Sequence, residues 1–431
     1  MFNKIKDNVF LKSTLILLFG GVLGKLVGFI IRIIITRSLS TSTIGYYSLL
    51  GPTTSLLSVI AIFSYSSAIS KYISDSSSRA KDLFSSIIPT SILINIIIII
   101  ITIIFGKILS NNLLKEEVLY LPIICISLTM PFISVSSILK GYFWGKQNMS
   151  PYMISNLIEQ IVRLLFIIIF INKIDNEIYI LCFLILINVI GEISSQIVML
   201  LYFPKIKLNN IRINFNEIKK VYTYCIPLTL SKIIGSLSYF LEPIIITNVL
   251  LLVGYSKNYI TYEYGIINAY SLSLLLMPQF FTQNMSTSLI PELSKNYSLR
   301  NIELCKKRIK QIILFSSFIG VLSTSIITIA PRFFLSLLYN TTKGVDYIRL
   351  LSPFTVLFYI ESPLITALNA IGDTKKIFKI TLKVSIIRII SIIFFSFFRI
   401  GMYSLVITII INLLLSTYFY YRELKNILNT I

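Results

Sequence analysis

Stretches of about 20 apolar residues recur along the whole of this 431-residue chain. An α-helix of that length crosses the hydrocarbon core of a lipid bilayer, which is about 30 Å thick. The mean hydropathy is +0.84 and only 13% of the residues are charged, well below the share that a soluble domain carries. We therefore predict an all-α integral membrane protein with about twelve transmembrane helices, at residues 13–35, 46–69, 85–105, 119–139, 151–171, 178–203, 222–253, 265–289, 311–331, 345–368, 378–398 and 402–420.

The seventh of these stretches, 222–253, is the longest and contains two prolines, Pro227 and Pro243. Proline removes a backbone hydrogen bond and its ring crowds the preceding turn. We therefore expect this helix to be bent or broken.

The formal net charge of +21 could indicate a nucleic-acid partner, but the cations lie in short loops between apolar stretches. If the N-terminus is cytoplasmic, Lys and Arg are about threefold more abundant in the loops on the cytoplasmic side, to which we assign Lys140. This asymmetry predicts a multi-pass protein of the bacterial cytoplasmic membrane with both termini in the cytoplasm. We expect membrane lipids, and no nucleic acid, as partners.

Cysteine and histidine usage gives no sign of a metal or disulfide site. The chain has no histidine, and its four cysteines are widely spaced without a C-x-x-C pattern. It also has no Gly-rich phosphate loop, nucleophile elbow or acidic pair in a large loop. We therefore predict that the protein is not an enzyme and needs no cofactor or metal.

An internal repeat suggests two related halves. Residues 23–28 (LGKLVG) resemble residues 230–235 (LSKIIG), and the segment that ends at Arg163 resembles the one that ends at Arg388. An even number of helices per half gives both copies the same orientation in the membrane. We predict two pseudo-symmetric six-helix lobes around a central cavity, an N-terminal lobe at 1–210 and a C-terminal lobe at 211–431.

Several ionisable residues lie inside the predicted membrane helices, where a charge is unfavourable by several kcal/mol and commonly marks a functional site. Lys25 is about 18 Å from the start of its helix and shares one helical stripe with Arg32. Lys232 occupies the corresponding place in the seventh helix. Paired cations in a water-filled cavity suit an anionic ligand such as a diphosphate. The candidate substrate-binding residues are Lys25, Arg32, Lys232, Arg163 and Arg388, and the candidate coupling or charge-pair residues are Glu159, Glu192, Glu242 and Glu361.

Structural explanations remain open for many of these residues. Gly20, Gly24 and Gly28 form a small-xxx-small pattern that packs helices together. Glu159 and Arg163 are spaced i and i+4, so they can neutralise each other as a buried pair. Glu192 and Glu361 can be interhelical partners of the cations, and Lys383 is close enough to the cytoplasmic face to snorkel.

Five segments carry a resemblance to a known group, and the loop 140–151 with its following Glu-Gln-Ile-Val-Arg is the most specific of them. They are 24–32, 67–74, 140–151, 158–163 and 226–237. Through them the chain resembles, over essentially its whole length, the polysaccharide-export flippases of the MOP superfamily. Within that superfamily it is most similar to the stage V sporulation protein B and MurJ-type lipid II flippase groups.

The resemblance implies two six-helix lobes that form a V-shaped cavity. It also implies alternating access that passes an undecaprenyl-diphosphate-linked saccharide, such as lipid II, outward for peptidoglycan, spore cortex or polysaccharide synthesis. Family cations that contact the head group match Lys25 and Arg32 in the first helix and Lys232 in the seventh. The family commonly has Arg at the position of Lys25, and it commonly has two further helices after the twelfth.

Our leading hypothesis is a flippase, expected to be a monomer, that moves a lipid-linked saccharide and is driven by the membrane potential or an ion gradient. A multidrug or cation antiporter of the same superfamily predicts acidic rather than basic cavity residues. A non-transporting scaffold of an envelope or sporulation complex predicts that neutralising the membrane charges is harmless. A membrane glycosyltransferase lacks the acidic loop residues that it would need.

Overall fold

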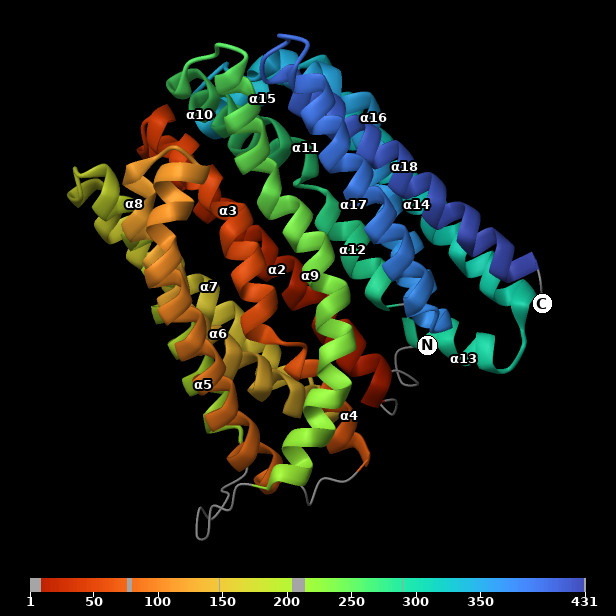
Figure 1. The fold of residues 1–431 in the computed structure, drawn as a ribbon. Coiled ribbons are helices and arrows are strands. Elements are labelled where there is room, and N and C mark those ends of the chain that lie inside the picture. The colour runs from red at the N-terminus through yellow and green to blue at the C-terminus, as the bar shows by residue number, and fades with distance from the viewer. Residues whose placement is uncertain (1–8, 76–79, 147, 204–213, 289, 430–431) are drawn as a thin grey trace. The chain divides into compact units, whose positions relative to one another are not determined.

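The computed structural model describes residues 9–75, 80–146, 148–203, 214–288 and 290–429. These ranges form helices joined by short connections, and no strand occurs in them (Figure 1). Nine helical segments in the described ranges are long and apolar enough to cross a membrane. The all-α membrane fold is therefore confirmed, while the number of twelve spans stays a prediction.

Contacts between Cα atoms divide the chain into two compact units. Unit 1 contains the residues up to Ser38 together with Leu50–Phe240, and unit 2 contains Leu39–Leu49 together with the residues from Leu241 onward. The predicted lobe boundary at 210/211 lies outside the described residues and stays a prediction. So do the predicted cytoplasmic cations Lys4, Lys6, Arg79, Lys205, Lys207 and Arg212.

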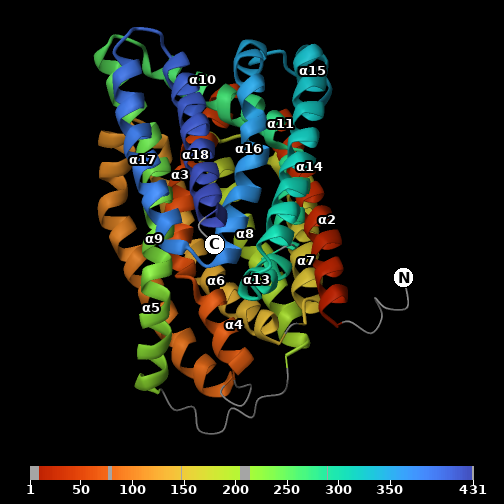
Figure 2. The ribbon, with the colours of Figure 1, turned by 90° about the vertical axis from the view of Figure 1, so that its right-hand side faces the viewer.

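Unit 1 is built around one central helix, α6, which packs against α4, α5 and α8. A second contact layer pairs α7 with both α2 and α8, and the same neighbours can be followed in Figures 1 and 2. Its elements are α2 (Val9–Ser38), most of α3 (Thr41–Ile62), α4 (Tyr65–Asp75), α5 (Ala80–Lys107), η2 (Ile108–Leu113), η3 (Glu117–Leu119), α6 (Tyr120–Gly145), α7 (Ser150–Phe170), η4 (Ile171–Lys173), α8 (Glu177–Leu201) and the first part of α9 (Phe215–Leu252).

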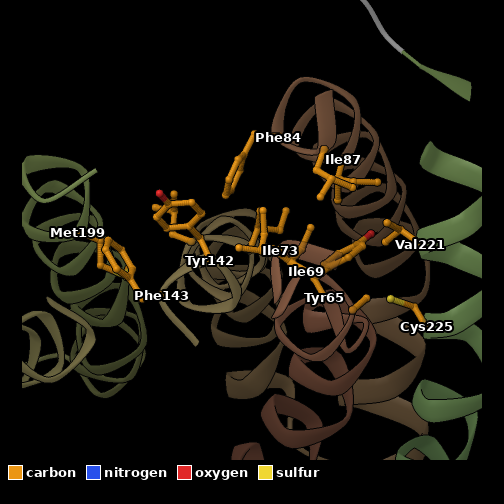
Figure 3. Packing of buried hydrophobic residues seen from close by; sticks show 14 residues of the cluster. Tyr65, Ile69, Ile73, Phe84, Ile87, Tyr142, Phe143, Met199, Val221 and Cys225 are labelled. Atoms are coloured by element: carbon orange, nitrogen blue, oxygen red, sulfur yellow. The ribbon is translucent and has the colours of Figure 1, made fainter. Parts of the chain in front are cut away.

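The core of unit 1 contains several aromatic side chains (Figure 3). The rings of Tyr142 and Phe203 lie 4.4 Å apart, and Phe84 packs edge-on against Phe203. The hydroxyls of Tyr65 and Tyr222 are hydrogen-bonded at 2.8 Å, which satisfies two polar groups inside an apolar cluster. These contacts join α4, α5, α6 and α9 into one packed core.

The close approach of α4 to α6 depends on two glycines four residues apart. A Cβ on Gly141 would lie 2.8 Å from the carbonyl oxygen of Ser66, and one on Gly145 would lie 2.7 Å from that of Ser70. Both distances are too short for a side chain, so the pair acts as a small-xxx-small packing seam. The most specific of the resembling segments therefore begins with a helix-packing feature.

Unit 2 has a core in which α16 packs against α14 and α18, and α17 packs against α18 (Figure 2). Leu364 and Leu368 of α16 are fully buried there, together with Cys305 of α14. The further elements of unit 2 are α10 (Lys257–Gly265), η5 (Ile266–Leu272), α11 (Ser273–Leu276), α12 (Gln279–Ser288), α13 (Ile290–Ser298), α14 (Ile302–Ile329), α15 (Pro331–Tyr339), α16 (Val345–Ile371), α17 (Thr374–Ser396) and α18 (Tyr403–Asn429).

Lys376 links α17 to α18 at one end of this core. Its ammonium lies 2.6 Å from Glu423 in α18 and 3.3 Å from Asp373 in its own helix. The hydrogen bond to Glu423, more than that to Asp373, holds the pKa of Lys376 above its ordinary value. The side chain of Lys376 is 43% exposed and screened by water, so this contribution to stability is small.

Helix breaks occur at other places than the prolines suggest. The seventh span is not broken, because α9 runs from Phe215 to Leu252 through Pro227 and Pro243; a bend at these prolines stays a prediction. Neighbouring helices and Ser or Thr side chains can satisfy the backbone groups that proline frees. The predicted second span is instead interrupted at Phe63 and Ser64, and the predicted eighth span is divided into η5, α11 and α12.

Candidate functional site

The glycine stripe of α2 is a packing surface for α7. A Cβ on Gly24 would lie 2.8 Å from the side-chain oxygen of Asn156, and one on Gly28 would lie 3.6 Å from that of Gln160. Gly20 faces Met153 in the same way. The helix-packing interpretation of these glycines is therefore confirmed.

Two of the predicted cations, Lys25 and Arg32, lie on the same helix beside this seam. Both side chains are exposed. They are seven residues apart, which is about two helical turns, so they are on the same side of α2. The two cations are therefore exposed on one side of the same helix.

Lys232 of α9 contacts the interruption between α3 and α4. Its ammonium donates a hydrogen bond to the Ser64 hydroxyl at 3.2 Å, and the Thr229 hydroxyl donates a second one to the same oxygen at 3.2 Å. Phe63 and Ser64 have φ angles of 46° and 53°, in the left-handed region that non-glycine residues rarely adopt. A helix break, a serine and a lysine are thus placed together within unit 1.

Sequence reasoning missed this interruption because the apolar stretch 46–69 continues through it. The segment Ile62-Phe63-Ser64-Tyr65 has no glycine or proline, which are the usual signals of a break. The contacts at the interruption come from α9, which is distant in the sequence. No local sequence signal marks this interruption.

A second group of charges lies between α7 and α8. Arg163 forms an ion pair with Glu159 at 3.3 Å, and both side chains are largely buried. A Cβ on Gly191 of α8 would lie 2.8 Å from Cγ and Cδ of Arg163, so only a glycine leaves room for the arginine stem. The charge-pair interpretation of Glu159 and Arg163 therefore describes their contact in this structure.

Lys140 belongs to the same group, and our assignment of it to a cytoplasmic loop is wrong. It lies inside α6, because this helix continues to Gly145, and its ammonium attracts the carboxylates of Glu192 and Glu159. Glu192 is only 9% exposed, and one of its carboxylate oxygens has no hydrogen-bond partner among the described residues. The apolar run that follows Lys140 was the available signal that the helix continues.

The predicted residues of unit 2 form a separate buried cluster. Arg388 of α17 is ion-paired with Glu242 of α9, and the Tyr264 hydroxyl donates a hydrogen bond to the same carboxylate at 3.3 Å. Glu361 of α16 accepts a hydrogen bond from Ser416 and also faces Arg388. One arginine thus lies near two carboxylates from different helices.

The nine predicted site residues therefore fall into four places. Lys25 and Arg32 share α2, Lys232 lies at the α3–α4 break, and the others divide between the two buried charge clusters. Within the described ranges, no three His, Cys, Asp or Glu side chains are grouped as metal ligands. The geometry offers exposed cations and two buried ion pairs, one within α7 and one between α9 and α17.

Comparison with known proteins gives two family matches. Residues 10–297 match the family described as polysaccharide biosynthesis protein, and residues 267–398 match the family described as MatE. The chain is 28% identical over 379 residues to stage V sporulation protein B of Bacillus subtilis (strain 168), covering 84% of this chain and 73% of that protein.

Two solved structures share the fold. One is the inward-facing conformation of a multidrug resistance MATE family transporter of the MOP superfamily, with a TM-score of 0.76, 13% identity, and 94% and 95% of the two chains covered. The other is the lipid II flippase MurJ in its inward closed conformation, with a TM-score of 0.72, 15% identity, and 94% and 87% covered. These identities establish likeness of fold alone.

Proposed function

Because the chain belongs to the polysaccharide biosynthesis protein family, we propose that it is a flippase for an undecaprenyl-diphosphate-linked saccharide in the bacterial cytoplasmic membrane. The observation that carries this proposal is the set of three cations, Lys25, Arg32 and Lys232, on helices of unit 1. Related proteins are named as a sporulation protein and a lipid II flippase, which agrees with peptidoglycan, spore cortex or polysaccharide synthesis.

Exposure of these cations supports a polar surface in the membrane. All three side chains are exposed, although they lie in helices predicted to span the bilayer. A charged side chain that faces lipid is strongly unfavourable, so exposed membrane cations face water or polar groups. A water-filled cavity lined by cations accommodates an anionic head group better than a neutral or cationic one.

A diphosphate fits the chemistry of the three residues. It carries several oxygens that accept charge-assisted hydrogen bonds from Lys and Arg. Arg32 can bind two of these oxygens at once, while Lys25 and Lys232 act as mobile point charges. Ser64 already holds the ammonium of Lys232, and a hydroxyl next to a lysine is a further donor for a phosphate oxygen.

The buried carboxylates have two roles in this proposal. Glu159 and Glu242 neutralise Arg163 and Arg388, so these two arginines serve packing rather than substrate contact. Glu192 and Glu361 have no ion pair within 4 Å among the described residues, and they are the candidates for coupling transport to an ion gradient or the membrane potential. We propose a monomer with both termini in the cytoplasm.

A multidrug or cation antiporter is the second candidate, because the MatE match covers residues 267–398 and a MATE transporter shares the fold. A cationic drug requires carboxylates that are not already neutralised. Glu159 and Glu242 are paired with arginines, and Glu192 and Glu361, which have no ion pair within 4 Å among the described residues, are not exposed. The exposed membrane charges named above are cationic. These charges favour the anionic substrate.

A transport assay with the protein reconstituted in liposomes tests the proposal. The substrate is lipid II that carries a fluorophore on its saccharide. An impermeant quencher then reports the fraction that has crossed. We expect Lys25→Ala, Arg32→Ala and Lys232→Ala each to slow crossing by roughly tenfold or more, because each charged hydrogen bond contributes about 1.5–3 kcal/mol. Lys232→Arg should retain more activity than Lys232→Ala.

Lys383→Ala is the matched control, because Lys383 is also an exposed cation on a membrane helix but lies 4.1 Å above the Phe419 ring in unit 2. It should leave crossing near the wild-type rate. Alanine variants that keep wild-type rates would refute the cation assignment. A wild-type chain that moves neither lipid II nor undecaprenyl diphosphate, yet exchanges a cationic dye, would favour the antiporter.

A further inference from the structure

Two of the four cysteines meet inside unit 1, although 57 residues separate them in the sequence. Cys125 of α6 and Cys182 of α8 are free thiols, each 7% exposed. The two thiols interact directly with each other, side chain to side chain. No motif in the sequence predicts this meeting, because it follows from the packing of α6 against α8.

The helix register explains why they meet. α6 begins at Tyr120 and α8 at Glu177, so each cysteine follows the start of its helix by five residues. Since a helix rises 1.5 Å per residue, each thiol is about 7.5 Å along its own helix axis. The two helices pack closely, and the chain neighbours Ile126 and Leu181 are also fully buried.

We propose that Cys125 and Cys182 form a redox-modification site that closes to an intramolecular disulfide between α6 and α8. The oxidant is a low-molecular-weight disulfide. One thiol, as thiolate, attacks the oxidant and releases one small thiol, and the second thiolate displaces the other small thiol from the mixed disulfide. The two cysteines lose two protons and two electrons in total, and the oxidant is reduced to two thiols.

The position of the pair along the helices determines which compartment lies nearest to the two thiols. In the orientation of the proposed function, α6 and α8 both begin at the extracytoplasmic side of the membrane. That side is oxidising, whereas the cytoplasm keeps thiols reduced. The compartment thus rests on the proposed orientation, but the chemistry of the pair is independent of whether the chain transports anything.

The other two cysteines supply the contrast. Cys225 is buried in the core of unit 1 with α4 and α5, and Cys305 is buried in the core of unit 2. Each is therefore enclosed by the core of a different unit. We expect neither to form an intramolecular disulfide.

The test uses the purified full-length chain in nanodiscs with Cys225→Ala and Cys305→Ala, which leaves only the pair. One equivalent of 2,2′-dithiodipyridine is added, and the chain is then denatured and analysed by peptide mass spectrometry. We expect a peptide that links Cys125 to Cys182, with no thiopyridyl group left, and dithiothreitol should restore two free thiols. Adding Cys182→Ser should instead leave a stable thiopyridyl mixed disulfide on Cys125.

Thiopyridyl groups on both cysteines of the pair, or two unmodified thiols, would overturn the proposal. A disulfide-linked dimer on a non-reducing gel would show that the link joins different chains, and it would overturn the proposal that the disulfide is intramolecular. The same peptide analysis of the wild-type chain checks that the link does not depend on the alanine substitutions. Since a cross-link restricts the unfolded chain, the oxidised form should also unfold at a higher temperature than the reduced form.

Discussion

The guanidinium of Arg388 in α17 is ion-paired with the carboxylate of Glu242 in α9, which brings together two residues 146 positions apart in the sequence. Removing one partner leaves the other charge buried without the counter-ion of this contact, although Arg388 still faces Glu361. We expect Glu242→Gln and Arg388→Gln each to lower the free energy of unfolding by about 3–5 kcal/mol. The double variant should lose less than the sum of the two, because no unpaired charge remains from this contact.

Thermal unfolding in detergent, followed through the four variants of this cycle, measures the coupling. The matched control is the pair of Arg308 and Glu292, whose side chains are 42% and 37% exposed. Its single variants should change stability by about 1 kcal/mol or less, because water screens exposed pairs. Equal effects in the two cycles would show that the Arg388 pair is not buried as described.

The second prediction concerns Lys140, which faces the carboxylates of Glu192 and Glu159 from inside α6. Lys140→Met keeps the length of the side chain but removes the charge that balances Glu192. We expect a clear fall in the midpoint of thermal unfolding, and a partial recovery when Glu192→Gln is added. The neighbouring Lys146 is exposed just past the end of α6, so Lys146→Met should be neutral. If adding Glu192→Gln does not raise the midpoint of thermal unfolding again, Lys140 and Glu192 are not energetically coupled.

The sequence was sufficient for the class of fold but not for the partners of its charges. Apolar stretches of bilayer length predict membrane helices, and an i, i+4 spacing predicts the Glu159–Arg163 pair, because both depend on local geometry. The contact of Arg388 with Glu242 depends on how α17 packs against α9, which no local pattern encodes. The same holds for the meeting of Cys125 with Cys182.

The prolines and Lys140 show a second reason why sequence-based prediction fails. Proline is a break signal in water, but a membrane helix can continue through Pro227 and Pro243 when tertiary neighbours satisfy the freed backbone groups. Lys140 was assigned to a loop because a charge normally ends an apolar span. Two carboxylates on α7 and α8 make the charge tolerable there, and they are visible only in the folded chain.

The third prediction concerns the glycines that let α4 approach α6. A Cβ at Gly141 or Gly145 would lie within 3.0 Å of backbone oxygens of α4, which cannot move away as a flexible side chain can. We expect Gly141→Ala and Gly145→Ala to reduce the folded yield and to lower the unfolding temperature. The control is Gly28→Ala, where the new methyl group makes an ordinary contact 3.6 Å from Gln160. A destabilisation by Gly28→Ala as large as by Gly145→Ala would contradict the packing seam.

The fourth prediction uses the backbone of Ser64, which combines a φ of 53° with a hydroxyl that accepts hydrogen bonds from Lys232 and Thr229. Ser64→Ala and Ser64→Gly both remove the hydroxyl, so their difference isolates the backbone. Because glycine adopts positive φ without steric strain, the glycine variant should be more stable than the alanine variant by about 1 kcal/mol.

The sign should reverse at Ser70, which lies in the interior of α4. There glycine should be less stable than alanine by about 1 kcal/mol, since alanine is the better helix former. Thermal unfolding of the four variants measures both differences under one condition. If alanine is the more stable residue at position 64 as well, the α3–α4 break does not persist in the membrane. In that case the hydrogen bond from Lys232 to Ser64 would also be absent from the wild-type chain in the membrane.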